Sequence, residues 1–424
     1  MIVLGNARVF DGERANADEL LDVAVEGDRI AAVDAGLAQG EVAERIDLAG
    51  AWLMPGLIDA HLHSTFAAEL DVYLRNGVTS IRYAGNPPGT IEQLRETVAR
   101  DGLRTPRILT CGPMLDSSPL SYPGYSVRVD TVEEVESAAA ALVEAGVDGF
   151  IVVQHVGPDL LAALVRIARP LELPVVGQIW RMDASEAAAA GISQLDNTSR
   201  IVASPVLASN ATPADVASRI AVLRRAWMDV DWEQTARLIA DMVAMDVSYC
   251  PTFVRLQWVA GLGPGTLTSL QADRDASAFD AEAHETWAVK VAVGQQAAED
   301  EQQLRDEWAH AYEAMLEWVR RFREAGGQLV VGTDTQFGGI MIHHELANLR
   351  DAGLSSLEVL QAATRNSGRA LGERTRTGRV KAGWLADLVV IEGDPRADLA
   401  TLRDPSLVMV GGQVVVNRLQ VGTR

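Results

Sequence analysis

The stretch Met54-Pro55-Gly56-Leu57-Ile58-Asp59-Ala60-His61-Leu62-His63-Ser64 decides how the rest of the chain is interpreted. The apolar residues after Pro55-Gly56 predict a short buried strand that ends in two histidines. Side chains at positions i and i+2 of a strand point to the same face, so His61 and His63 can bind one metal ion from one side. An isolated His-x-His pair is a weak signal, and the elements around it give it weight.

From Leu57 onward, apolar segments alternate with helical patterns. Several of the helical patterns are followed by glycine, as at Gly102 and Gly146, where helices commonly stop. Eight apolar segments, each followed by a helix, predict an α/β fold of the (β/α)8 TIM barrel type. An open doubly wound sheet is the alternative, but no Gly-x-Gly-x-x-Gly turn occurs. The expected strands are Leu57–His63, Val78–Arg82, Arg107–Cys111, Phe150–Val153, Pro174–Gln178, Ile192–Asp196, Val247–Cys250 and Gln328–Gly332.

Both ends of the chain show short segments of alternating apolar and polar residues, separated by turns such as Asp11-Gly12. Neither end has enough strands to form a core alone, so we expect the two ends to pack together. The sequence therefore predicts a small β-sandwich built from residues 1–53 and 380–424, with the barrel at residues 54–379 inserted between them.

Composition excludes several classes of function. The 424 residues carry a formal net charge of −21, which argues against a nucleic-acid partner or an anionic membrane surface. The two cysteines, Cys111 and Cys250, indicate buried thiols rather than a disulfide framework. No basic segment followed by an apolar core marks the N-terminus, and no apolar run approaches the length of a membrane span. We therefore expect a cytoplasmic protein.

Active sites of TIM barrels lie at the carboxyl ends of the strands. Asp334 follows the apolar segment 329–332 after Thr333, where it is either a helix N-cap or a metal ligand and general base. With His61 and His63 it would form a two-histidine, one-carboxylate set that leaves coordination positions open for water and substrate. The predicted cofactor is at most one divalent metal, with zinc as the first choice.

These motifs resemble those of the amidohydrolase superfamily, in its imidazolonepropionase-like and prolidase-like subgroup. Residues 54–63 resemble the family's first barrel strand, residues 77–82 its second, residues 332–335 its eighth and residues 383–390 its closing segment. The resemblance implies a hydrolase in which a metal centre activates a water that attacks an amide, lactam, ester or related bond. It also implies a small-molecule substrate and a homo-oligomer.

Several positions depart from the family pattern. The family's fourth strand usually ends in a lysine, where this chain has Val152. The histidines of its fifth and sixth strands are replaced by Gln178 and Asn197, whose amides can bind a substrate carbonyl. The Arg-Asp after the family's second strand is Arg82-Tyr83 here. The metal site is therefore atypical, either reduced to one metal or replaced by a metal-free pocket.

Other polar side chains are candidates for substrate binding, each with a packing or surface alternative. Tyr83 and His155 follow predicted strands, and His343 and His344 lie in the segment after Asp334. Trp258 and Trp287 lie in a poorly repeating region that would cover the site as a lid. No run of Arg or Lys marks an anion clamp.

Three functions remain open from the sequence. The first is a hydrolase that acts on a C–N bond of an amide or cyclic amide, or on a related C–O bond, with Asp334 accepting a proton from the attacking water. The second is a lyase, isomerase or decarboxylase on the same fold with little or no metal. The third is a catalytically silent binding protein.

Overall fold

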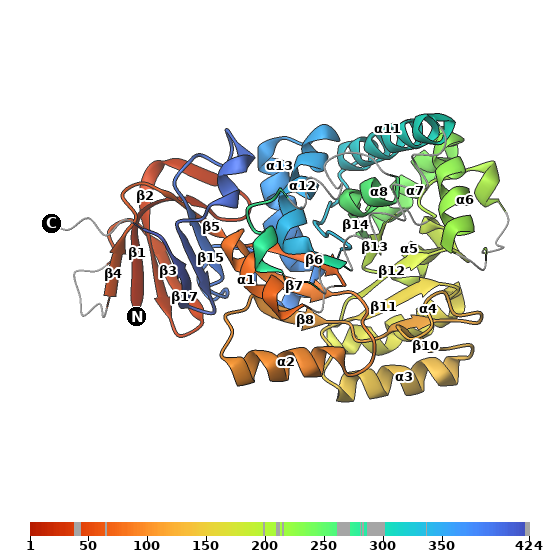
Figure 1. Ribbon diagram of the computed structural model, residues 1–424, viewed down its shortest axis with the longest axis horizontal. Coiled ribbons are helices and arrows are strands. Elements are labelled where there is room, and N and C mark those ends of the chain that lie inside the picture. The colour runs from red at the N-terminus through yellow and green to blue at the C-terminus, as the bar shows by residue number, and fades with distance from the viewer. Residues whose placement is uncertain are drawn as a thin grey trace.

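The computed structural model describes residues 1–37, 44–63, 66–197, 200–208, 213, 216–260, 272–279, 281, 284–285, 302–335 and 337–419. Figure 1 shows two parts side by side: a β-rich part that carries both chain ends, and a larger part in which helices surround strands. We call them the terminal sheet and the α/β body. No described helix is both long enough and apolar enough to cross a membrane.

The terminal sheet contains strands from both ends of the chain, in the order β17-β16-β15-β5-β1-β2-β3, with β4 paired to β1. β5 joins the two ends, because it runs parallel to β1 on one side and antiparallel to β15 on the other. The described strands therefore belong to one continuous sheet, whereas the sequence analysis expected a β-sandwich. The bounds are β1 (Ile2–Phe10), β2 (Ala15–Glu26), β3 (Arg29–Asp34), β4 (Glu44–Asp47), β5 (Trp52–Pro55), β15 (Leu388–Ile391), β16 (Leu407–Val410) and β17 (Gln413–Asn417).

A single hydrophobic cluster holds the two ends of the terminal sheet together. It contains Leu4 and Val23 from the N-terminal strands and Leu388, Val390 and Leu407 from the C-terminal strands, all fully buried. Apolar residues of the N-terminal strands thus pack against residues more than three hundred positions later in the chain. This packing supplies the core that neither end could form alone.

The α/β body has the TIM-barrel-like pattern of parallel strands followed by helices. Its strands form two parallel sheets, β6-β7-β8 and β10-β9-β11-β12-β13-β14. The extended segment from Gln328 to Thr335 lies between these sheets, since the Val330 amide donates to Tyr249 of β14 and the Ala60 amide of β6 donates to Val331. The bounds are β6 (Leu57–Leu62), β7 (Val78–Tyr83), β8 (Arg107–Thr110), β9 (Met114–Asp116), β10 (Ser126–Arg128), β11 (Phe150–Gln154), β12 (Val175–Ile179), β13 (Gln194–Asp196) and β14 (Ser248–Cys250).

Helices cover the outside of the parallel strands (Figure 1). Their main hydrophobic cluster also takes in Trp227 and Trp308, which favours packing roles for these two tryptophans. The Trp258 side chain and Trp287 lie outside the described residues, so the predicted lid stays a prediction. The bounds of the principal helices are α1 (Ala67–Arg75), α2 (Thr90–Asp101), α3 (Val132–Glu144), α4 (Pro158–Ala168), α5 (Ala184–Ala190), α6 (Val216–Met228), α7 (Trp232–Ala244), α8 (Phe253–Ala260), α11 (Gln302–Glu324), α12 (Gly338–Asp351), α13 (Ser356–Gln361) and α14 (Ser367–Ala370).

Candidate metal centre

His61, His63 and Asp334 come together at the carboxyl ends of their strands. Oδ1 of Asp334 lies 3.0 Å from Nε2 of His63 and 3.6 Å from Nε2 of His61. One possible ligand atom from each residue lies within 4.8 Å of the other two. The backbone fixes this arrangement, because the Asp334 amide donates to the His61 carbonyl at 2.7 Å and the His63 amide donates to the Thr335 carbonyl at 3.1 Å.

Both imidazole rings are oriented through their Nδ1 atoms. Nδ1 of His61 lies 3.0 Å from Oδ2 of Asp196, and Nδ1 of His63 lies 2.9 Å from the carbonyl oxygen of Gly85. The His63 contact is a hydrogen bond to a backbone carbonyl, and the His61 contact is an ion-pair distance to a carboxylate. Both contacts turn Nε2 of the ring toward Asp334. Metal-binding histidines are commonly oriented in this way by a carboxylate or a backbone carbonyl.

A buried chain of polar groups extends behind His61. Asp196 accepts a hydrogen bond from the amide of Gln194, and Gln194 accepts one from Arg82 at 3.1 Å. Arg82 is fully buried and also donates to the carbonyls of Ala60 and Ala370. The arginine thereby compensates the charge of a carboxylate that lies deep between the strands, where an unpaired charge would be unfavourable.

Oδ2 of Asp334 faces a different set of partners. It accepts a hydrogen bond from Nδ2 of Asn197 at 2.9 Å and lies 3.8 Å from Nε of Arg255. The Asn197 carbonyl group in turn accepts from Thr252. Asn197 therefore joins the cluster, as the sequence predicted, but its amide group positions Asp334.

Several residues at these strand ends have left-handed backbone conformations that side-chain-bearing residues seldom adopt. They are Gln154, Asn197, Thr252 and Asp334, with φ values of 26°, 59°, 52° and 48°. Strain of this kind persists only where surrounding contacts hold it, and it gathers at ligand-binding sites. Its concentration at one end of the strands supports this end as the functional face.

The electrostatics of the cluster are dominated by burial and opposite charge. Burial alone would lower the pKa of His61, but the charges and hydrogen bonds of Asp196 and Asp334 raise it to about 10. Burial would raise the pKa of Asp334, but the two histidines hold it well below its ordinary value. Asp334 is therefore an ionised carboxylate, available as a ligand.

The donor set fits a divalent metal. Both ring nitrogens of His61 are buried and lack a hydrogen-bond partner of good geometry within the described part of the chain, although each lies near a carboxylate. An imidazole nitrogen left without a partner beside a second imidazole and a carboxylate is the environment that a cation would satisfy. Two nitrogens and one oxygen suit zinc and several first-row transition metals.

The chain cannot supply the lysine that the family uses to bridge two metals. It contains only two lysines, Lys290 and Lys381, and the described parallel strands include no lysine. The structure also changes which residue of β11 faces the interior. Val152 packs in the main hydrophobic cluster with the helices, whereas Ile151 and Val153 pack in a separate, interior cluster. The inward-facing position is thus Val153, because neighbouring residues of a strand face opposite sides.

Gln178 and Tyr83 differ in their suitability for substrate binding. Gln178 is half-buried on β12, opposite Val153 and two residues beyond the interior residue Val176. By strand alternation its side chain faces the interior, as expected for a residue of the site. Tyr83 is instead buried in the main hydrophobic cluster, where burial raises the pKa of its hydroxyl well above the ordinary value. A packing role therefore suits Tyr83 better.

His155 and the pair His343 and His344 lie apart from the cluster's described contacts. Nδ1 of His155 is 3.1 Å from the Ser121 hydroxyl and 3.5 Å from Oδ1 of Asp116, so a local polar network holds the ring at the end of β11. Nε2 of His343, which lies on α12, is 3.1 Å from the carbonyl of Asn76 at the end of α1. Burial lowers the pKa of His344, and the nearby charge of Arg403 lowers it further. We therefore leave His343 and His344 out of the site.

Sequence reasoning missed three residues near Asp334. Asp196 directly precedes Asn197, which the sequence analysis did select. Its position at the end of a predicted strand could have marked it as a candidate site residue. Arg255 lies on α8, and no pattern in the sequence marks it. Tyr122 packs on the interior cluster, and its pKa is raised by burial and then influenced by Arg219 and Asp334.

Comparisons with known proteins find similarity to amidohydrolases. A model of the amidohydrolase family matches residues 266–415. An uncharacterized protein of Mycobacterium tuberculosis is 26% identical over 380 residues, which cover 86% of this chain and 85% of that protein. Imidazolonepropionase of Pseudomonas aeruginosa is 37% identical over 79 residues, 17% of this chain and 20% of that enzyme.

Among solved structures, a putative prolidase from Bifidobacterium longum is similar over 98% of this chain and 94% of that one. Its TM-score is 0.69, at 21% sequence identity. This likeness shows a shared fold. The sequence matches show that the C-terminal part of the chain is similar to the amidohydrolase family.

We predict that Asp196→Asn weakens metal binding about 10- to 100-fold, the usual cost of losing a partner that orients a metal ligand. The neutral amide no longer offers an anionic acceptor to Nδ1 of His61. Competition with a chromophoric chelator measures the affinity for zinc, and Asp101→Asn, which changes an exposed carboxylate, is the control. Equal affinities in both variants would contradict this role of Asp196.

A second prediction concerns stability in acid. The pKa of His343 is lowered to about 3 by burial and then by Arg403. Between about pH 6.5 and pH 3, the His343 imidazole is therefore protonated in the unfolded chain but neutral in the folded protein. Stability should fall as pH drops from 6.5 toward 3. The limit for one proton is about 1.4 kcal/mol per pH unit, and the partial exposure of the side chain makes the effect smaller. Urea unfolding of His343→Gln should show a weaker pH dependence than the parent, whereas His310→Gln, at an exposed histidine, should not.

Proposed function

We propose that the protein is a hydrolase of amide or other C–N bonds in small molecules. It would use one divalent metal, with zinc as the first choice, held by His61, His63 and Asp334. The single observation that carries this proposal is the convergence of two Nε2 atoms on Oδ1 of Asp334, with each Nδ1 held by its own oxygen. Similarity of residues 266–415 to the amidohydrolase family supports the reaction class.

The side chains around the metal ligands have separable roles. When bound, a divalent metal lowers the pKa of a water molecule and polarises a carbonyl. Asp334 turns Oδ1 toward the histidines and Oδ2 toward Asn197, so Oδ2 is placed to accept a proton from an attacking water. The Arg255 side chain is 41% exposed beside Oδ2 and can donate to a substrate oxygen. Gln178 offers a further amide donor from β12.

Charge and ligand count favour one metal over two. Asp334 is the one carboxylate in the candidate ligand set, and Asp196 is already occupied by His61 and Gln194. Two divalent ions would bring four positive charges into this buried region, where uncompensated charge is costly. Without a lysine on the parallel strands, no carbamate can form there to offset that charge.

We also propose that the two parallel sheets and the segment between Gln328 and Thr335 act as one (β/α)8 barrel spanning residues 54–379. Hydrogen bonds from this segment to both β14 and β6 support the proposal. The terminal segments 1–53 and 380–424 would then form the accessory domain.

The proposal predicts metal-dependent hydrolysis. Zinc-loaded protein should cleave members of a panel of proline-containing dipeptides, N-acyl amino acids and cyclic amides, chosen because of the prolidase and imidazolonepropionase likenesses. Asp334→Asn should lower kcat/KM at least about a hundredfold, because it removes both a ligand charge and the proton acceptor. His310→Ala, at an exposed histidine, is the control and should match the parent.

Chelation and isotope labelling separate the alternatives. Hydrolysis should stop in chelator and return with zinc, and one oxygen from labelled water should enter the product. A product formed without labelled oxygen, at a rate that chelator leaves unchanged, would favour a lyase, isomerase or decarboxylase and contradict the proposal. Failure to turn over any substrate while zinc binds at the site would favour a binding protein.

A further inference from the structure

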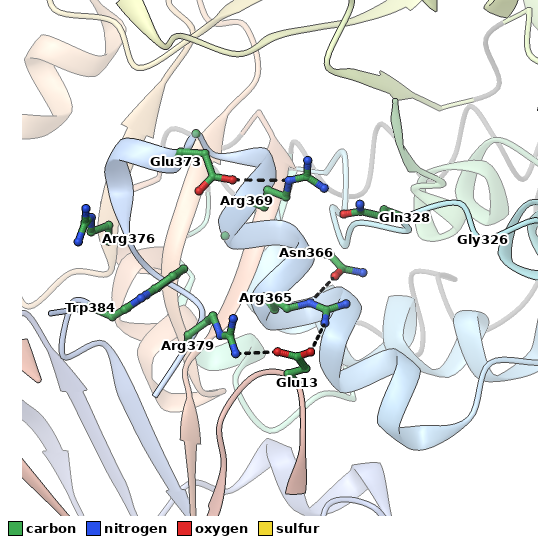
Figure 2. A pocket seen from close by; sticks show the side chains of 12 residues that line it. Glu13, Gly326, Gln328, Arg365, Asn366, Arg369, Glu373, Arg376, Arg379 and Trp384 are labelled. Carbon is green, nitrogen blue, oxygen red and sulfur yellow. Dashed lines mark hydrogen bonds and ion pairs between the residues drawn. The ribbon is translucent and has the colours of Figure 1, made fainter. Parts of the chain in front are cut away.

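A second cavity lies at the opposite end of the α/β body from the metal centre. It has a volume of about 580 Å³, and Figure 2 shows its lining side chains. Gln328 lines it at the start of the extended segment that ends near Asp334. Six residues of extended chain span roughly 20 Å, so the two sites are well separated. The charged and aromatic lining residues are Glu13, Arg365, Arg369, Arg376, Arg379 and Trp384.

The lining of this cavity is positive, in contrast to the chain as a whole. Four arginines and two glutamates, Glu13 and Glu373, leave a net charge of +2 on the lining residues (4 − 2), whereas the whole chain carries −21. A concave surface lined by one sign of charge concentrates ions of the opposite sign.

The arginines differ in how far their charges are already compensated. Arg369 is paired with Asp246, and Arg379 donates to Glu13 at 2.8 Å. Nη1 of Arg365 is 3.9 Å from Glu13, which is too long for a hydrogen bond. Arg376 makes no ion pair with a carboxylate in the described part of the chain, although its backbone is held at a left-handed φ of 47°. Arg365 and Arg376 therefore retain donors for a ligand.

Arg379 adds a further sign of incomplete pairing. Its guanidinium lies 5.8 Å from the ring centroid of Trp384, and its Nε is buried without a hydrogen-bond partner among the described residues. A buried donor that lacks an acceptor is unfavourable. An oxyanion in the cavity would supply one.

We propose that this cavity binds a small organic anion with at least two negative charges, such as a phosphate monoester or a dicarboxylate. Guanidinium groups bind such oxygens in pairs, and the half-buried indole of Trp384 in the lining suits an attached apolar group. The volume is within the range of small-molecule sites. Glu13 and Trp384 come from segments beside the terminal sheet, and Arg365 and Arg369 come from the α/β body, so the ligand would bridge the two parts and stabilise the folded protein.

The competing interpretation is that these charges only hold the two parts of the protein together. The variant Glu13→Gln separates the two interpretations. It removes a carboxylate that competes for Arg365 and Arg379, so an anion site should bind its ligand more tightly. If the arginines act only through ion pairs, the same variant should lower thermal stability with no gain in binding.

Isothermal titration of the full-length protein with phenyl phosphate and, separately, with succinate tests the proposal, with sodium chloride holding ionic strength constant. We expect one site per chain and a raised Tm with at least one probe. Arg376→Ala and Arg365→Ala should each weaken binding about tenfold, the scale of one lost charge-assisted pair. Arg374→Ala is the matched control, because Arg374 is exposed in the same segment and does not line the cavity.

Titration of a His61→Ala variant tests for binding at the metal centre. Because the proposed site is the cavity, this variant should bind the probes as tightly as the parent does. The preferred probe identifies the class of anion. No saturable binding of either probe, or equal loss in Arg374→Ala and Arg376→Ala, would overturn the proposal. Binding that disappears in His61→Ala would also overturn it, because the probe would then occupy the metal centre. None of these outcomes depends on the proposed hydrolysis.

Discussion

The rest of the candidate site depends on the contact between the Asp196 carboxylate and Nδ1 of His61. Both side chains are fully buried, so neither can change partner for water. Asp196 is itself held by Gln194, and Gln194 by Arg82, which reaches across to β6 and α14. This chain of contacts fixes the rotation of the imidazole. It thereby determines where Nε2 points and where a cation can be bound.

Burial makes this arrangement selective for a cation. His61, Asp196 and Asp334 are packed with almost no exposure to solvent, and the two carboxylates outnumber the single imidazole between them. The metal-free protein responds by holding a proton on His61, as the raised pKa shows. A divalent metal can replace that proton and interact with Asp334 and both Nε2 atoms together. The site thus matches a family in which metals are usual, with fewer ligands than the family pattern supplies.

Much of the fold followed from local patterns in the sequence. The helix at Val132–Glu144 ends shortly before Gly146, where the sequence predicted a helix stop, and Thr131 and Glu134 form a capping box at its start. His61, His63 and Asp334 were found because strand ends in this fold share one face. The register of β11 was wrong by one residue at Val152, since a strand buried on both faces shows no alternation to read.

Other features were beyond the reach of the sequence. The polar chain from Arg82 to Asp196 joins three strands, and no local spacing reveals contacts between strands. His343 and His344 are close to Asp334 along the chain, but on α12 the His343 ring contacts the Asn76 carbonyl, and both rings are influenced by Arg403. The arginines of the second cavity were overlooked because they are spaced through residues 365–379 rather than adjacent, and the fold gathers them.

The most direct test is an X-ray structure of the zinc-loaded protein, with anomalous data collected on both sides of the zinc absorption edge. The account predicts one strong anomalous peak per chain, about 2.0–2.2 Å from Nε2 of His61, Nε2 of His63 and Oδ1 of Asp334. Asp196 should remain in contact with Nδ1 of His61. Two peaks at this face, or one peak coordinated by other residues, would contradict the account.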